Sequence, residues 1–440
     1  MRFSLRRLIN HKIRSRRWVV YLLFGLLILC FGSTFLNISI LLLAPATVET
    51  LRSFHPGALA FTAFTAFLIC AFWFYKGFKI AFDLLDSRDA ELSSKLKEFV
   101  FHRNHKDERP SIVALGGGTG LSSLLKGLKD VDVKLTAVVT VTDDGGSSGR
   151  LRKDLQMLPP GDIRNCICAL SKTENLLTKL FQYRFSEGGD MEGHSFGNLF
   201  IAAMTGVLGD FSSAVREAGS ILAIKGVVVP VTCDNVQLHA DFTDGTQMEG
   251  ETAICEVKKP IAKISLVPEG AQPNPEALSA IDDANMIILG PGSLYTSVIP
   301  NLLLPEVVEH INNSNSTVVY ICNVMTQPGE TDDFSGIDHV KTILNKTGLK
   351  KLDVVVVNSR QATKKLMAKY EAKHQYWVPP TVKRIEELGI RVVATDLLSE
   401  SDLLRHNPIT LANIIANLVE EKKKNTATIE SAESAVDFED

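Results

Sequence analysis

Two long uncharged stretches open the chain, and a pattern of short apolar runs follows them. Residues 18–44 and 56–75 carry no charged side chain, and each can cross about 30 Å of hydrocarbon as a helix, which needs roughly 20 apolar residues. The alternative is a signal peptide followed by a buried helix, but the first stretch is too long for that and no small-residue cleavage site is evident. We therefore expect residues 18–75 to form a two-helix transmembrane hairpin.

Charge divides the chain at the same place. Residues 1–17 hold seven of the 47 basic side chains and no acidic one, which leaves 40 basic and 50 acidic side chains in the rest. Basic residues also flank the far end of the hairpin. We therefore expect a two-pass protein of the bacterial cytoplasmic (inner) membrane, with the basic arm (residues 1–17), the globular domain and both termini on the cytoplasmic side. The acidic body argues against binding to nucleic acid.

Strand-like and helix-like patterns alternate after a charged segment at residues 76–109, which we expect to be a linker helix. This alternation predicts an α/β domain over residues 110–421, with a mostly parallel sheet and helices on both faces. Residues 236–266 predict an antiparallel insertion, and residues 422–440 predict a disordered acidic tail. The expected strands cover residues 111–115, 134–141, 225–231, 286–289, 317–321, 352–357 and 391–394, and the clearest helices cover residues 121–128, 305–312, 336–344 and 411–421.

Four glycines in five residues follow the first expected strand. The run is Gly116, Gly117, Gly118, Thr119 and Gly120, and it opens a helix, where glycine lets the backbone approach a phosphate and free N–H groups can bind it. The run lacks the lysine of a Walker A loop and the third glycine of a dinucleotide fingerprint, which argues against an NAD-dependent oxidoreductase. A tight strand-to-helix turn is the alternative, but it accounts for two glycines better than for four.

Acidic residues follow the second expected strand. Asp143 and Asp144 precede the segment GGSSGR, and they should lie near the glycine run because the carboxyl ends of parallel strands meet at one edge of the sheet. An acid there can accept ribose hydroxyls or hold Mg²⁺ beside phosphates, although Asp-Gly-Gly is also ordinary turn chemistry. In the next motif, PPGDIRNC, Asp162 is expected to cap the start of a helix. Capping does not explain Arg164 and Asn165, so both are candidate ligand-binding residues.

The segment GHSFGNL places His194 and Asn198 four residues apart, where they can share a helix face. It contains no Gly-x-Ser-x-Gly elbow, so a hydrolase triad is weakly supported. A lone histidine is more often structural than catalytic. His194 is therefore a candidate with an open alternative.

A second glycine turn follows the strand expected at residues 286–289. It contains Gly290, Gly292 and Ser293, and Asn323 and Gln327 follow the next strand along the chain. Two glycine turns at neighbouring strand ends could hold two ends of one phosphorylated ligand.

Together these segments resemble the CofD-like superfamily over roughly residues 110–420. The resemblance rests on GGGTG followed by LLKGL, and on VTVTDDGGSSGRLR, PPGDIRNC, GHSFGNL, LGPGSLYTSVIPNLL and YICNVMTQPGET. It is closest to the YvcK branch, the gluconeogenesis factors, and implies a Rossmann-like α/β fold. It also implies binding of UDP-sugars and a role in cell shape and envelope synthesis under gluconeogenic growth. The sister branch, 2-phospho-L-lactate transferase, transfers a phospholactyl group from a guanylylated donor to a deazaflavin with Mg²⁺.

The resemblance also implies roles for residues: the two glycine turns face a diphosphate, Asp143, Asp144 and Asn198 surround the nucleotide or a metal, and Asn323 and Gln327 contact the sugar or base. We expect a membrane-tethered regulatory factor that binds UDP-N-acetylglucosamine or UDP-glucose and forms a homo-oligomer. The alternative is an Mg²⁺-dependent transferase with a nucleotide-activated donor, in which Asp143 and Asp144 hold the metal and His194 joins them as a catalytic candidate. The full set expected at the ligand is Gly116, Gly117, Gly118, Thr119, Gly120, Asp143, Asp144, Arg164, Asn165, Asn198, Gly290, Gly292, Ser293, Asn323 and Gln327.

Overall fold

The structure is a computed structural model that describes residues 109–172, 176–400 and 404–436. The basic arm, the transmembrane hairpin and nearly all of the linker helix expected before residue 110 lie outside the described residues. Within the described ranges, no helix is both long enough and apolar enough to cross a membrane.

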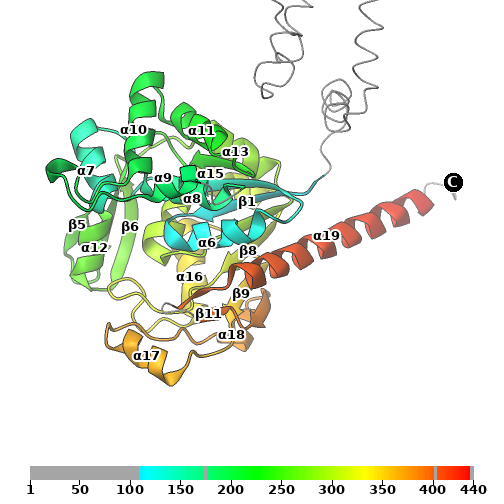
Figure 1. Ribbon diagram of the computed structural model, residues 1–440. Coiled ribbons are helices and arrows are strands. Elements are labelled where there is room, and N and C mark those ends of the chain that lie inside the picture. Colours follow the sequence, from blue (N-terminus) through cyan, green and yellow to red (C-terminus); the bar gives the residue numbers. More distant parts are fainter. Residues whose placement is uncertain (1–108, 173–175, 401–403, 437–440) are drawn as a thin grey trace, which may run out of the picture. The chain divides into compact units, whose positions relative to one another are not determined.

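In the described part of the chain, seven parallel strands form the central sheet (Figure 1). Their order is β10-β9-β8-β7-β1-β2-β3, so the chain builds one half outward from β1 and then returns beside β1 to build the other half. Strands β7 and β9 are buried along their whole length, as expected when helices cover both faces of a parallel sheet. The strands are β1 (Ser111–Gly116), β2 (Lys134–Val139), β3 (Val227–Pro230), β7 (Met286–Leu289), β8 (Thr317–Ile321), β9 (Val354–Asn358) and β10 (Arg391–Thr395).

The sequence therefore predicted the α/β class, the parallel sheet and all seven of these strands, and the structure confirms them as a Rossmann-like arrangement. The apolar spacing that predicted them also explains their packing. In α6 (Gly118–Leu128), for example, Leu121, Leu124, Leu125 and Leu128 are buried, which is the spacing of one helix face. The other helices before the insertion are α7 (Gly146–Leu155), α8 (Gly161–Leu170), α9 (Leu176–Gln182), the 3₁₀ turn η2 (Gly189–Met191), α10 (Phe196–Leu208) and α11 (Phe211–Ile221).

The expected antiparallel insertion is also present. Strands β4 (Gln237–Phe242), β5 (Gln247–Glu249) and β6 (Ile261–Val267) pair in the order β5-β4-β6. Helix α12 (Glu251–Val257) connects β5 to β6 along the chain. The helices that follow are α13 (Pro275–Asp282), the π-helical turn η3 (Leu294–Val298), α14 (Ile299–Leu302), α15 (Pro305–Asn313), α16 (Gly336–Thr347), α17 (Lys364–Glu371) and α18 (Val382–Glu386).

The C-terminal region differs from the disordered tail that the sequence predicts. After the antiparallel hairpin of β11 (Leu398–Glu400) and β12 (Leu404–His406), helix α19 runs from Pro408 to Val436 (Figure 1). Residues 422–436 thus continue the helix. The segment EEKKKN contains Glu and Lys at i,i+4 spacing and is followed by several Ala and Glu residues, a composition that favours helix despite its polarity.

Candidate functional site

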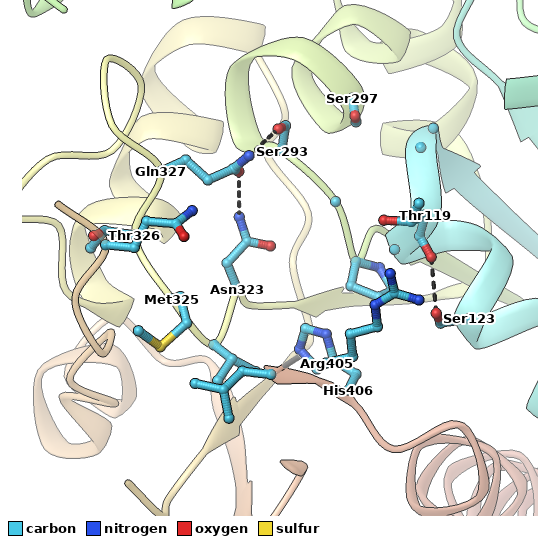
Figure 2. Close-up of a pocket in the computed structure, with 18 of the residues that line it drawn as sticks. Thr119, Ser123, Ser293, Ser297, Asn323, Met325, Thr326, Gln327, Arg405 and His406 are labelled. Atoms are coloured by element: carbon cyan, nitrogen blue, oxygen red, sulfur yellow. Dashed lines mark hydrogen bonds between the residues drawn. The ribbon is translucent and has the colours of Figure 1, made fainter. Parts of the chain in front are cut away.

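A cleft of about 540 Å³ opens where the two halves of the sheet meet, at the carboxyl ends of β1 and β7. Ligands of open α/β sheets bind at such a switch point, because the loops of the two halves part there. The loops after β1, β7 and β8 line one side, and α17 with β12 lines the other. Figure 2 shows Ser293 and Ser297 across the cleft from Arg405 and His406.

The two glycine turns approach each other closely. A Cβ added to Gly120 would overlap the backbone carbonyl of Pro291 and lie 3.0 Å from Gly292 Cα. One added to Gly117 would lie 2.7 Å from Asp162 Oδ2. Gly118 and Gly290 have positive φ angles, which other residues adopt at a cost. The glycines are therefore required by loop packing, and the same packing brings both turns to one cleft.

Helix α6 begins inside the first glycine turn. Its N-cap, Gly117, has no side chain with which to cap the helix, and the positive end of the helix dipole faces the cleft. Hydroxyl groups of Thr119, Ser123, Ser293 and Ser297 line the same region. Backbone N–H groups, a helix dipole and hydroxyls suit an anion such as a phosphate.

The loop after β8 is tied to the second glycine turn by a chain of hydrogen bonds. Asn323 Nδ2 donates to Gln327 Oε1 at 3.3 Å, and Gln327 Nε2 donates to Ser293 Oγ at 2.5 Å (Figure 2). Ser293 Oγ in turn donates to Glu330 Oε1 at 3.2 Å. The backbone N–H of Tyr295 donates to the other Glu330 oxygen at 3.3 Å. Glu330 thus connects the loop after β8 to the second glycine turn through both of its carboxyl oxygens. Burial raises the pKa of this carboxyl group.

The opposite wall consists of side chains that sequence analysis did not identify. Lys369, Tyr370 and Lys373 from α17 and its C-terminal end, together with Arg405 of β12, line the cleft. The Tyr370 hydroxyl accepts a hydrogen bond from the Leu404 backbone N–H at 2.7 Å, which joins α17 to β12. The i,i+4 lysines beside a tyrosine are a weak signal in the sequence, and Arg405 has none.

Three carboxyl groups also face the cleft: Asp143, Asp162 and Glu251. Burial, and then the charge of Asp143, raise the pKa of Asp162 to about 6. Burial, and then Asp143, Asp162 and Glu330, raise the pKa of Glu251 to about 9, so Glu251 is protonated at neutral pH. The prediction that Asp162 is a helix N-cap is wrong, because Pro160 is the N-cap of α8 and Asp162 lies in the first turn of that helix. The Asp162 carboxyl group instead accepts a hydrogen bond from the Gly118 backbone N–H.

Residues 112–398 match the sequence model of the family described as 2-phospho-L-lactate transferase CofD. The match covers more than half of the chain. The chain belongs to the CofD family. Within that family it is similar to gluconeogenesis factors: the Bacillus subtilis protein of that name is 44% identical over 315 residues, which cover 71% of this chain and 99% of its own length.

Two further comparisons delimit the conserved part of this CofD family member. A Clostridium acetobutylicum relative is 40% identical over 425 residues, covering 93% of this chain and 91% of its own, so that similarity extends into the residues before 109. A solved structure of a UPF0052 family member from Bacillus halodurans has a TM-score of 0.68 at 43% identity, covering 70% of this chain and 99% of its own. The latter corresponds in extent to the α/β domain alone.

Several residues expected at the ligand lie outside the cleft lining of this CofD domain. His194 Nδ1 and Asn198 Nδ2 both contact Ser147 Oγ, at 2.9 and 3.0 Å, and Arg164 donates to Asn165 Oδ1 at 2.7 Å. The members of the expected set that line the cleft are Gly117, Gly118, Thr119, Gly120, Asp143, Gly292, Ser293, Asn323 and Gln327. Gly116 and Gly290 lie just behind the two turns, where a Cβ added to Gly116 would lie 3.7 Å from Gly290 Cα.

The expected pair of Mg²⁺ ligands, Asp143 and Asp144, does not form one site in the cleft. Asp144 Oδ1 accepts from the backbone N–H and hydroxyl of Thr252, at 3.0 and 2.6 Å, and so caps α12 instead of facing the cleft with Asp143. No group of three or more acidic, His or Cys side chains in the described residues is arranged to hold a metal. Asp143 with Asp162 fits better, because Mg²⁺ commonly takes one or two carboxylates and completes its shell with water and phosphate oxygens.

Proposed function

We propose that this CofD family member is a regulatory factor that binds a UDP-sugar in the cleft between its two glycine turns. The observation that carries the proposal is the meeting of both turns at the switch point, with the N-terminus of α6 and four hydroxyls beside them. The similarity to gluconeogenesis factors supports a role in gluconeogenic growth. We also propose a role in cell shape and envelope synthesis, which the resemblance to the CofD-like superfamily implies.

Each part of a UDP-sugar has suitable chemistry in the cleft. The diphosphate lies on the turns, where backbone N–H groups and hydroxyls donate to it. The uracil ring stacks on Tyr370, with Arg405 beside it. Asn323 and Gln327 donate and accept hydrogen bonds at the sugar, and the carboxyl group of Asp143 accepts from its hydroxyls. This regulatory function does not require catalysis, because the presence of the UDP-sugar in the cleft is itself the signal.

A thermal-shift series on the purified chain tests this proposal. UDP-N-acetylglucosamine, UDP-glucose, GDP and NAD are compared with and without Mg²⁺. A ligand at 100 times its dissociation constant adds about 2.7 kcal/mol to the free energy of unfolding. We expect stabilisation by at least one UDP-sugar and little by NAD. Stabilisation by GDP with no response to any UDP-sugar would refute the UDP-sugar assignment.

A second candidate function is transfer of a phospho-group from a nucleotide-activated donor. It is favoured by Asp143 and Asp162, which face the cleft side by side with one raised pKa, and by the family description. Mg²⁺ held by Asp143 and Asp162 would neutralise charge on the donor's diphosphate, in which the bond between the two phosphoryl groups breaks and the nucleoside monophosphate leaves. Asp143→Asn should then abolish turnover of a nucleotide-linked donor while nucleotide affinity without metal changes little. If no such donor is turned over, the regulatory function remains.

We also propose that residues 18–75 anchor the chain in the bacterial inner membrane, on the strength of their length and lack of charge. Relatives that align over 99% of their own length cover only about 70% of this chain, so the domain exists elsewhere without such a segment. The full chain should remain with membranes after alkaline carbonate extraction, whereas residues 105–440 should be released. Extraction of the full chain would contradict the anchor.

A further inference from the structure

Elsewhere in the described part of the chain, a second cavity of about 520 Å³ lies between α16 and β6. We call it the α16–β6 pocket. It shares no lining residue with the cleft described above. Lys263 and Ile264 of β6, Phe334, and Lys341, Thr342 and Lys346 of α16 form most of its wall.

Secondary structure brings the three lysines to this cavity. Thr342 and Lys346 are four residues apart on α16 and share one helix face, and Lys341 borders that face, so all three line the pocket. Strand β6 is an edge of the small sheet, and its free edge faces the helix, since Lys346 Nζ donates to the Ala262 carbonyl at 2.5 Å. Two elements distant in sequence thus direct three ammonium groups to one concave surface.

The two nearby carboxylates keep their charge but make their hydrogen bonds to other groups. Asp338, the acidic residue in the wall, accepts from the Ser335 backbone N–H at 2.9 Å and from its hydroxyl at 2.6 Å, closing the cap of α16. Asp241, opposite Lys263 on β4, accepts from Gln247 at 2.7 Å and contacts His239. Among the described residues, Lys263, Lys341 and Lys346 have no ion-pair partner.

The electrostatics of the pocket follow from this imbalance. Burial lowers the pKa of Lys346, and three lysines outnumber the one carboxylate in the pocket wall, Asp338. Like charges around a concave surface repel one another and concentrate anions. The rest of the chain after residue 17 has more acidic than basic side chains, so a positive pocket here is a local exception.

Protection of the β6 edge is the competing explanation, because lysines on edge strands prevent pairing with other chains. It accounts for Lys263 and for the contact of Lys346 with Ala262. It does not account for Lys341, which lies on the helix across the cavity.

We propose that the α16–β6 pocket is an anion-binding site for a small molecule that carries two or more phosphate groups. The ammonium groups of Lys263, Lys341 and Lys346 neutralise its charge, and the Phe334 ring packs against its organic part. A ligand with several charges is required, because a single charge leaves two of the three lysines unpaired. The site is independent of the UDP-sugar proposal.

Lysine acylation of the full chain, with inorganic pyrophosphate as the probe, distinguishes this pocket from the cleft. Acylation rates are measured residue by residue by mass spectrometry. Lys263 and Lys341 report on the pocket, Lys369 and Lys373 on the cleft, and exposed Lys153 is the reference. At ten times its dissociation constant, the probe should slow acylation of both pocket lysines about tenfold. Protection of the cleft lysines alone, or equal protection of Lys153, overturns the proposal.

Sulfate at matched ionic strength separates binding from screening. It should protect the pocket lysines clearly less than pyrophosphate does, and equal protection would mean that charge screening alone is observed. The double substitution Lys263→Gln with Lys341→Gln should weaken pyrophosphate binding in the pocket at least about tenfold by calorimetry, and the matched control is Lys153→Gln with Lys383→Gln. Aggregation of the first variant with unchanged pyrophosphate binding would show that the lysines only protect the edge.

Discussion

The two walls of the cleft are built in different ways. The wall formed by the glycine turns is backbone, and it extends directly from β1 and β7 in the middle of the main hydrophobic core. The opposite wall is made of side chains from α17 and β12. It rests on a small apolar cluster of its own, formed by Val324, Met325, Leu398 and Leu404 with partly buried neighbours.

Because of this difference, we expect the two walls to have separate roles in ligand recognition. The glycine wall cannot move without disturbing the central strands, so it offers one fixed geometry, suited to a diphosphate that every nucleotide-sugar shares. No residue of α17 in the described structure is fully buried, so its side chains can change without damage to the core. We therefore expect the glycine wall to decide whether a nucleotide binds, and the opposite wall to decide which one.

The largest expected effect is that of Gly120→Ala. The new Cβ would overlap the Pro291 carbonyl, so the two turns have to separate. Misplacement by about 1 Å can cost about a hundredfold, and we expect UDP-sugar affinity to fall by about that factor or more in calorimetry. Gly206→Ala in α10 is the matched control, because nothing lies within 4 Å of its added Cβ. Retained affinity in Gly120→Ala would show that the turns are not the diphosphate site.

The same contrast explains what the sequence could reveal. Glycine turns after buried strands are local patterns, so Gly117–Gly120, Gly292 and Ser293 were predictable, as were the strands that carry them. Asp144 looked equivalent to Asp143, but its partner Thr252 lies 108 residues away in the insertion. No local pattern predicts that contact.

The opposite wall shows the same limit. Tyr370 and Arg405 come together only because α17 packs beside β12, and the bond from Leu404 to Tyr370 spans 34 residues. His194 and Asn198 do lie together, because both contact Ser147. They do not share a helix face as their spacing predicts, because His194 precedes Ser195, the N-cap of α10.

Arg405→Gln tests the opposite wall. Loss of a charged hydrogen bond to the ligand costs about 1.5–3 kcal/mol, so we expect UDP-sugar affinity to fall about 10- to 100-fold. Because the substitution is on the wall that selects the nucleotide, the preference for UDP-sugar over GDP should narrow. Arg384→Gln, which lies outside the cleft, should change neither quantity. An unchanged preference would argue that selection occurs on the glycine wall.

A pH series tests the carboxyl groups beside the glycine wall. The pKa of Asp162 is raised to about 6, so below pH 6 the group is neutral and above it the group is negative. A negative charge about 4 Å from a phosphate costs about 1 kcal/mol even in bulk water. Without Mg²⁺, affinity should therefore fall about fivefold from pH 5 to pH 7. Asp162→Asn should abolish that fall, and a fall of the same size in the variant would assign it to another group.

The smallest expected effect is that of Tyr370→Phe, which keeps the ring and removes only the hydroxyl that accepts the Leu404 N–H. This bond lies within the protein and is worth about 1 kcal/mol. Its loss lowers UDP-sugar affinity only by loosening the wall, so calorimetry should show a loss of about fivefold at most. The exposed Tyr376 supplies the control, Tyr376→Phe, with no change expected. Because the ring and the glycine turns remain, selectivity over GDP should stay as it is. A loss comparable to that of Gly120→Ala would mean that the opposite wall is as rigid as the turns, and the contrast between the two walls would then be wrong.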